Sequence, residues 1–345
     1  MAPAIEDNRL ATIEGIIIRI MPVLSRREFA GALIAGLPLA AVMGSLRLSA
    51  AEVPVWVSTS SFRDLPRIQG RDNLDDVIRA LQAVGATHVE LALANLEPAP
   101  PSIAPVMGGS AAYPKRIVLT PEQVAATNSV ARAELRAWRL QTPVTVFDKA
   151  RGTLAFAGLT VHACALAYND SFTDDEIDAT FRHARALGVT TVSSPLTMTM
   201  ARRLLPFAQR HEMTVAIHNQ VDGNAASAID TPVLKEVLAL SPAFTLKLDI
   251  GNLAASNCDA VAELRAHHSR VSYVLLKDRL RNGGASQPFG EGDTPIKQVL
   301  SALATSAPGI SAAIEYDYVG LRSSVDELRA CVAYCRAAMA ATSSR

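Results

Sequence analysis

The sequence lacks the features of a disulfide-stabilised, nucleic-acid-binding or disordered protein. Its 345 residues include only 4 cysteines, too few for a disulfide scaffold. Neither sign of charge is in excess, because 33 Lys and Arg face 33 Asp and Glu. This balance argues against non-specific binding of nucleic acids or anionic membranes. Charged residues make up only 19% of the chain and hydrophobic ones 49%, which excludes disorder and allows one large domain or two ordinary ones.

The first fifty or so residues have the features of an export leader. Ser25–Phe29, which reads SRREF, precedes an apolar stretch, Ala30–Met43, that glycines and a proline interrupt. Small residues follow, with Ser49 and Ala51 at positions −3 and −1 of a cut after Ala51. The paired arginines resemble the twin-arginine signal of bacteria. We therefore predict a leader over residues 1–51, the twin-arginine export machinery as a partner, and a periplasmic or secreted protein.

A membrane anchor or a buried helix is the alternative interpretation of this apolar stretch. The stretch is short against the roughly 20 residues that a membrane span requires. We therefore expect no stable membrane span after the leader is removed. Residues 1–20 are long for the part that precedes such a signal, so Met1 and Met21 both remain candidate starts.

After residue 52 the chain alternates short runs typical of strands with longer helical patterns. The spacing from one strand to the next is mostly about 25 to 40 residues, which is a βα period. The stretch between the second and third strands is longer, about 70 residues, and must carry extra structure. The eight predicted strands are Val55–Ser58, Thr87–Ala92, Leu159–Tyr168, Val189–Ser194, Met213–Asn219, Phe244–Asp249, Val271–Lys277 and Ser311–Tyr316.

Eight βα units predict an α/β fold, a single (β/α)8 TIM barrel over residues 52–345. A doubly wound open sheet is the alternative, but no G-x-G-x-x-G follows the first strand. Thr120, followed by proline, is predicted to cap a helix that runs to about Arg139. Buried thiols outside disulfides are the preferred interpretation of Cys164, Cys258, Cys331 and Cys335.

Polar side chains that bind metals or substrates stand at the predicted carboxyl ends of the strands, where barrel enzymes build their sites. Because side chains alternate along a strand, His218, Asp249 and Glu315 are expected to converge at the barrel mouth. One imidazole and two carboxylates suit one divalent metal ion such as Mn²⁺, Zn²⁺ or Mg²⁺, so we predict these three as metal ligands. Lys277 beside Asp278 forms an ion pair or neutralises an oxyanion.

Several short segments together resemble the sugar phosphate isomerase/epimerase superfamily, the xylose isomerase-like barrels. The resemblance covers about residues 53–337, and its order and spacing are more specific for the superfamily than for any substrate. It implies a metal site with one ligand from each of strands five to eight. The segments are Val215–Asn219 (VAIHN), Leu248–Asn252 (LDIGN), Leu276–Asp278 (LKD), Phe289–Asp293 (FGEGD), Ile314–Tyr316 (IEY) and Glu134–Arg139 (ELRAWR).

This chain departs from the superfamily pattern at several positions. Many members read His-Leu-Lys-Asp where this chain has Leu275–Asp278, and Gln220 stands where a second histidine is common. Ser193 and Ser194 end strand four where some relatives carry an acid. The implied site therefore keeps three protein ligands, with Gln220, water or substrate oxygens to complete the shell. Either an open catalytic site or a weakened one is consistent with these differences.

The resemblance implies carbohydrate chemistry in which an α-proton is removed through a metal-stabilised enediolate. Glu315 is the candidate base, and His218 is the second catalytic candidate. Isomerisation, epimerisation and β-elimination from a keto-sugar all stay open, and export favours an unphosphorylated small carbohydrate. Candidate substrate contacts are Glu90, Lys277, Gln220 and Asn252.

Two other functions compete with the enzyme. One is a non-catalytic periplasmic carbohydrate-binding barrel with a degenerate metal site. The other is a nuclease, which the neutral charge and the small number of histidine and acidic ligands oppose, so no nucleic-acid partner is expected. A homodimer is consistent with other barrels of this superfamily. His88, His162 and His183 are interpreted as packed or surface histidines, with His162 the nearest of the three to a functional position.

Overall fold

The computed structural model describes residues 53–100, 106–110, 113–117, 120–221 and 232–343. The chain separates into two units, Met1–Ser49 and Ala50–Arg345. The predicted leader lies outside the described residues, so the fold below is that of the second unit.

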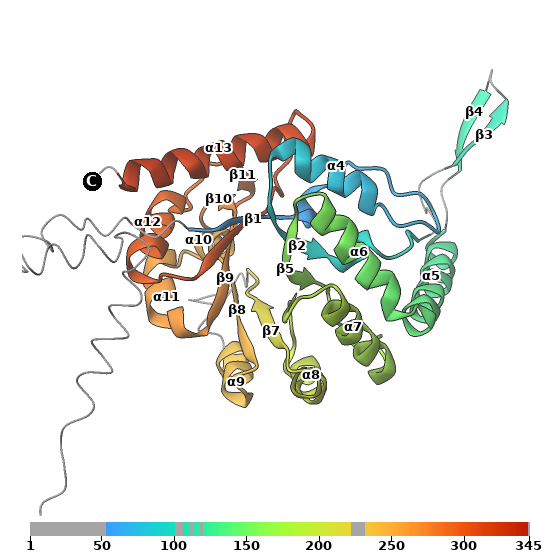
Figure 1. Ribbon diagram of the computed structural model, residues 1–345. Coiled ribbons are helices and arrows are strands. Elements are labelled where there is room, and N and C mark those ends of the chain that lie inside the picture. The colour runs from blue at the N-terminus through green and yellow to red at the C-terminus, as the bar shows by residue number, and fades with distance from the viewer. Residues whose placement is uncertain (1–52, 101–105, 111–112, 118–119, 222–231, 344–345) are drawn as a thin grey trace, which may run out of the picture. The chain divides into compact units, whose positions relative to one another are not determined.

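Eight parallel strands close into a barrel, as the sequence predicts (Figure 1). Around the barrel the strands follow the order β1-β12-β9-β8-β7-β6-β5-β2. Their bounds are β1 Val55–Ser58, β2 His88–Ala92, β5 Thr160–Ala165, β6 Thr191–Ser194, β7 Thr214–His218, β8 Phe244–Asp249, β9 Val271–Leu276 and β12 Ser311–Ile314.

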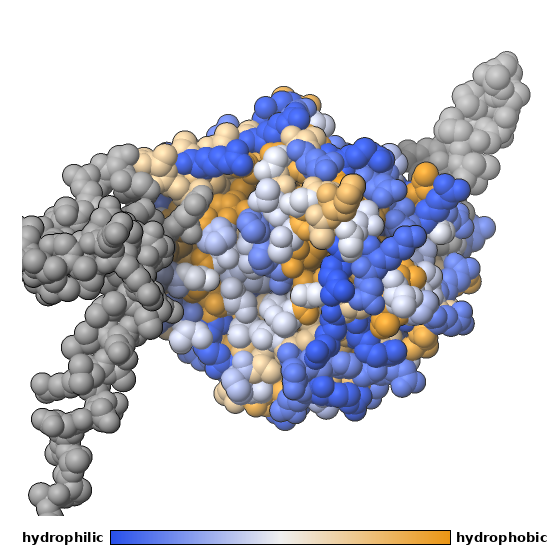
Figure 2. All heavy atoms as spheres, in the orientation of Figure 1, coloured by the Kyte–Doolittle hydropathy of each residue, from blue (hydrophilic) through white to orange (hydrophobic). Residues whose placement is uncertain are grey.

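Helices lie outside the barrel and connect its strands (Figure 1). Hydrophilic side chains dominate the surface around α6 and α7, the side of these helices that faces away from the strands (Figure 2). Among the described residues, no helix is both long enough and apolar enough to cross a bilayer. The helices that follow barrel strands are α4 Leu74–Val84, α7 Asp174–Ala186, α8 Met198–Arg210, α9 Pro232–Leu240, α10 Ile250–Ala255, α11 Ala260–His267, α12 Ile296–Ser306 and α13 Ser324–Ser343.

The long stretch between β2 and β5 holds a β-hairpin and two helices. The hairpin pairs β3 (Val106–Ser110) with β4 (Tyr113–Ile117), and the helices are α5 (Pro121–Gln141) and α6 (Val144–Phe156). The predicted cap at Thr120 is confirmed. Its hydroxyl accepts from the backbone amide of Gln123 at 3.2 Å, and the Gln123 side chain accepts from the Thr120 amide at 2.8 Å. This reciprocal capping box fixes where α5 begins.

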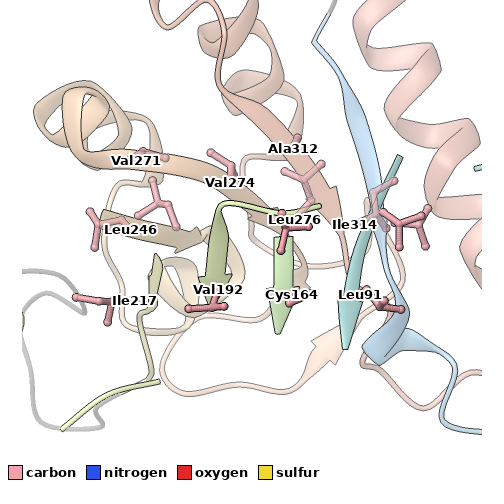
Figure 3. Close-up of a cluster of buried hydrophobic side chains, with 14 of the residues drawn as sticks. Leu91, Cys164, Val192, Ile217, Leu246, Val271, Val274, Leu276, Ala312 and Ile314 are labelled. Carbon is pink, nitrogen blue, oxygen red and sulfur yellow. The ribbon is translucent and has the colours of Figure 1, made fainter. Parts of the chain in front are cut away.

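Two apolar groups alternate along the strands. The outer group packs between strands and helices and includes Leu246 and Leu276 (Figure 3). The inner group fills the barrel and consists of Trp56, Ala163, Ala216, Tyr273, Leu275 and Ala313. Because successive side chains point to opposite faces of a strand, this parity sends Asp249, Lys277 and Glu315 inward at the strand ends. Cys164, Cys258, Cys331 and Cys335 are buried thiols, as predicted.

Short additional elements complete the described chain. Two-residue strands β10 (Asp278–Arg279) and β11 (Ser286–Gln287) pair antiparallel after β9. Single turns of 3-10 helix lie at Thr59–Ser61, Leu93–Asn95 and His268–Arg270.

Candidate functional site

Four side chains from consecutive strand ends meet at the carboxyl end of the barrel. Nε2 of His218 lies 2.9 Å from Oδ2 of Asp249. The Nζ atom of Lys277 lies 3.3 Å from the same Oδ2 and 3.5 Å from Oε2 of Glu315. The structure therefore brings together the three residues that the sequence predicts as metal ligands, but a lysine joins them.

The ammonium group of Lys277 stands among three carboxylates. Besides Asp249 and Glu315 it contacts Oδ2 of Asp317 at 3.3 Å. Burial by itself lowers the pKa of Lys277, but the three negative charges outweigh burial and hold it well above its usual value. Lys277 is therefore a fixed cation at neutral pH, with no lone pair to act as a base or a nucleophile.

Asp317 is a member of this cluster that the sequence does not single out. A signal for it exists, because it stands two positions after Glu315, and residues two apart share a face of an extended chain. Its side chain is 20% exposed, against 14% for Glu315 and 0% for Asp249. The three carboxylates thus range from fully buried to partly open to solvent.

Asp249 is held more tightly than the other two acids. It caps α10, because Oδ1 accepts from the backbone amide of Asn252 at 2.9 Å. Burial raises the pKa of the Asp249 carboxyl, but the charge of Lys277 and the hydrogen bond from His218 lower it well below its usual range. Asp249 is therefore ionised at all ordinary pH values and serves as an anchor for His218 and Lys277.

Two asparagines lock the ends of β7 and β8 together. The Asn219 side chain accepts from the Asp249 amide at 2.7 Å and donates to the Asp249 carbonyl at 3.1 Å. Asn252 donates from Nδ2 to the Asn219 carbonyl at 2.8 Å and accepts from Arg279 at 2.7 Å. Both ends of the Asn252 side chain therefore have a protein partner, and its contact with a substrate stays a prediction from the sequence.

Glu90 lies inside the barrel with no exposed surface. Its Oε1 atom accepts from Lys247 at 2.6 Å, from Ser193 at 2.9 Å and from the hydroxyl of Tyr273 at 2.5 Å. Burial raises the pKa of Glu90, but the charge of Lys247 and these hydrogen bonds lower it to about 2. The charged partner of Glu90 within the barrel is Lys247, and a contact of Glu90 with a substrate stays a prediction from the sequence.

The remaining predicted contact, Gln220, is exposed just after β7. Its amide nitrogen lies 3.4 Å from the carbonyl oxygen of His218. Of the other histidines, His88 and His162 pair at 2.8 Å and His162 stacks on Trp56, while His183 stacks on Phe147. These three histidines are packed in the described structure, in line with the interpretation from the sequence.

A cavity of about 450 Å³ opens beside the cluster. Around it, in the part of the chain that the structure describes, lie His218 and Glu315 but not Asp249 or Lys277. Small-molecule sites typically measure about 300 to 1,000 Å³, so this cavity is large enough for a small ligand. Other lining residues are Ser60, Glu97, Arg132, Arg139, Asn169, Phe172, Ser193 and Lys247.

One wall of the cavity is an ion-pair network that we did not predict from the sequence. Arg139, on α5, is 4% exposed and binds both carboxylate oxygens of Glu97, at 2.7 and 2.9 Å. It also donates to Glu176 at 2.7 Å, and Arg132 donates to the same carboxylate at 2.6 Å. The spacing of the two arginines, which places them on one face of α5, is the sequence signal for this wall.

The cluster around Lys277 does not fit a divalent ion as it stands. No three His, Cys, Asp or Glu side chains in the described ranges are placed to hold a metal. Two unit charges 4 Å apart interact by about 4 kcal/mol at an effective dielectric constant of 20, and a divalent ion would double the repulsion from the ammonium. The three-ligand arrangement expected from the sequence is therefore not the arrangement that these residues form.

Comparisons with known proteins place the fold. No model of a known protein family matches the sequence, and no curated protein does. Solved structures do match. A sugar phosphate isomerase/epimerase from Parabacteroides distasonis is 13% identical, with a TM-score of 0.52 over 82% of this chain and 93% of that one.

Two further barrels are similar at the level of fold. An L-ribulose 3-epimerase is 11% identical, with a TM-score of 0.56 over 84% of this chain and 96% of its own. The IolI protein, crystallised with a zinc atom, is 10% identical, with a TM-score of 0.55 over 84% and 98% of the two chains. At such identities the likeness concerns architecture alone, and the chain shares with these proteins the fold of a (β/α)8 TIM barrel.

Proposed function

We propose that this protein is a carbohydrate isomerase, epimerase or keto-sugar lyase that removes a proton next to a carbonyl group. The observation that carries the proposal is the position of Glu315. Its carboxylate lies at the carboxyl end of the barrel beside the cavity and close to His218 and a fixed cation. The neighbouring Asp249 is fully buried and held by protein donors, which leaves Glu315 as the carboxylate best placed to meet a substrate.

The chemistry follows from that placement. Glu315 takes the α-proton as a general base, and the electron pair of the broken C–H bond forms a C=C bond while the carbonyl oxygen becomes an oxyanion. Returning the proton to the former carbonyl carbon, while the α-hydroxyl passes its own proton to the oxyanion, gives an isomer. Returning it to the opposite face of the α-carbon, as the carbonyl re-forms, gives an epimer. Loss of a β-hydroxyl as water gives elimination. His218, fixed by Asp249, is positioned to bind a substrate hydroxyl in the same cavity.

The substrate class rests on fold and cavity together. The similar structures include a sugar phosphate isomerase/epimerase and an L-ribulose 3-epimerase, and the cavity is large enough for a monosaccharide. The IolI protein was crystallised with a zinc atom. Because Lys277 stands among the predicted ligands, no step above runs through a metal. We further propose that residues 1–51 direct export and that the sugar is unphosphorylated.

Proton exchange with solvent tests the proposed base. Wild-type protein incubated in D₂O with a panel of free ketoses and keto-sugars is expected to incorporate deuterium at the α-carbon of one of them, followed by NMR. Glu315→Gln should lower that rate by about 10²- to 10⁴-fold, the usual contribution of general acid–base catalysis. Glu291→Gln, at an exposed position, is the matched control and should exchange at the wild-type rate.

Two outcomes would contradict the proposal. Unchanged exchange in Glu315→Gln would remove Glu315 as the base. Tight binding of a sugar without any exchange by the wild type would instead favour the non-catalytic carbohydrate-binding barrel. The ion pair of Asp249 with Lys277 is the observation that favours this second function.

A further inference from the structure

We propose that the ammonium of Lys277 takes the place of a divalent cation in this site, so that the protein binds no divalent ion there and works without one. The inference rests on the proposed function only in taking the cluster as the reaction centre. The placement of the cation itself rests on the geometry of Lys277 and its neighbours.

The first support is the arrangement around Nζ. Three carboxylate oxygens, from Asp249, Glu315 and Asp317, lie 3.3 to 3.5 Å from this one nitrogen. These distances are longer than an ideal charge-assisted hydrogen bond. They indicate that the ammonium is shared among three acids and is not held in a single pair. The nitrogen thus occupies the point at which these negative charges converge.

The second support is that Lys277 has little freedom to leave. The residue is 7% exposed. A Cβ atom added to Gly251, in α10, would lie 2.7 Å from the Cβ of Lys277 and 3.1 Å from its carbonyl oxygen. The helix backbone therefore lies directly against the base of the lysine. On the other side, the Glu315 amide donates to the carbonyl of Leu276 at 3.1 Å, which ties the two strand ends together.

The third support is what the cluster would become without the amine. One imidazole and three carboxylates, from His218, Asp249, Glu315 and Asp317, would then remain without the cation that the three acids now share at 3.3 to 3.5 Å. Such a donor set suits Mn²⁺, Co²⁺ or Zn²⁺. Lys277 therefore supplies the positive charge that this donor set would otherwise take from a cation.

Lys277 acts as a positioning residue in this arrangement. It does not line the cavity among the described residues, whereas Glu315 and His218 do. Its positive charge offsets the mutual repulsion of the three acids and holds them close together, as a metal ion would. The ammonium keeps its three protons throughout, so no proton or electron leaves it during the reaction.

Metal titration of the full chain tests the inference. Wild-type protein is expected to show no stoichiometric uptake of Co²⁺ or Mn²⁺ by calorimetry and no visible Co²⁺ absorption band. Lys277→Met removes the charge at similar volume and should bind about one ion, with at least a 100-fold gain in affinity. Lys277→Met combined with Asp249→Asn should lose it again, and Lys149→Met, at an exposed position of α6, should behave as wild type.

Each result supports or overturns the inference. A wild-type protein that takes up one ion, and loses it in Asp249→Asn, overturns it. So does a folded Lys277→Met that binds no more metal than wild type, because the ammonium would then not be what excludes the ion. If circular dichroism shows Lys277→Met unfolded, Lys277→Gln is titrated instead, and the wild-type result stands by itself.

The metal titration and the proton-exchange experiment can fail independently of each other. A protein that exchanges no sugar proton, but shows this pattern of titration, would refute the proposed reaction and leave the role of Lys277 intact. A protein that exchanges protons at the same rate with and without a chelator agrees with both. Exchange that a chelator abolishes and Mn²⁺ restores would overturn the inference alone.

Discussion

Two buried lysines of this barrel, Lys247 and Lys277, differ in the number of carboxylates that they contact. Lys247 forms one short ion pair with Glu90 inside the barrel, at 2.6 Å. Lys277, at the mouth, has three carboxylate partners, all at longer distances. An ammonium with a single buried partner mainly neutralises it, whereas the ammonium of Lys277 also contacts two partly exposed acids, which can still meet a ligand. The same type of residue therefore has two effects: Lys247 neutralises one buried acid, whereas Lys277 holds three acids together.

We predict that Lys247→Met destabilises the protein by about 3–5 kcal/mol, because it leaves the carboxylate of Glu90 buried and without its cation. Chemical denaturation at neutral pH measures the change. Adding Glu90→Leu to the same chain should recover much of the loss, since a buried pair replaced by apolar residues is often neutral. A Lys247→Met protein as stable as wild type would mean that Glu90 does not depend on this charge.

The residues of the site show where prediction from sequence stops. Alternation along strands was enough to place His218, Asp249 and Glu315 on one side, because parity depends only on local geometry. The partner of Lys277 was not predictable in this way. The sequence offers its neighbour Asp278, but that carboxylate instead accepts backbone amides of Gly290 and Thr294, at 2.7 and 3.1 Å. Which acid meets a lysine is decided by the closure of the barrel.

Elements of regular structure were the easiest part of the fold to predict. All eight barrel strands follow from runs of apolar and β-branched residues at a regular spacing, and β1 and β8 have the expected bounds. The hairpin β3–β4 was predicted only as extra structure, because its pairing is a local event that the βα period does not encode. Short α10 depends on the carboxylate of Asp249 at its first turn, a contact visible only in three dimensions.

Two glycines in helices are expected to respond in opposite ways to alanine. Gly251→Ala, in α10, places a methyl group 2.7 Å from the Cβ of Lys277, which should destabilise the protein by about 1–3 kcal/mol through overpacking. Gly152→Ala lies at an exposed position of α6, where an added methyl group meets no atom within 4 Å. It should stabilise the protein by about 0.5–1 kcal/mol through helix propensity. Thermal unfolding of the two variants checks the contrast, and equal effects would contradict the close packing of α10 on Lys277.

At the scale of the whole molecule, the predicted barrel and the predicted leader concern different parts of the chain. The barrel is described by the structure, and the leader lies outside the described residues. The neutral balance of 33 basic and 33 acidic residues therefore says little about where the protein works. Its meaning lies in the local grouping of charges at the barrel mouth and along α5.

Export is tested on the intact chain. Replacing Arg26 and Arg27 by lysine should keep the protein in the cytoplasm at its full length, because the twin-arginine signal is read by its own receptor. Cell fractionation with an antibody to the barrel, and N-terminal sequencing of the wild type, measure the location and the cut expected after Ala51. A wild-type chain that stays in the cytoplasm uncut would contradict the leader.

The carboxylate of Glu90 also constrains how the chain can be made and divided. Its partners on β6, β8 and β9 lie 103, 157 and 183 residues further along the chain. During synthesis the cation for Glu90 arrives only with β8, and the full set only with β9. A fragment that ends after β6 would bury this acid beside serine hydroxyl groups, without its cation. We therefore expect the barrel to fold late and as one unit, and its first half to have no stable existence by itself.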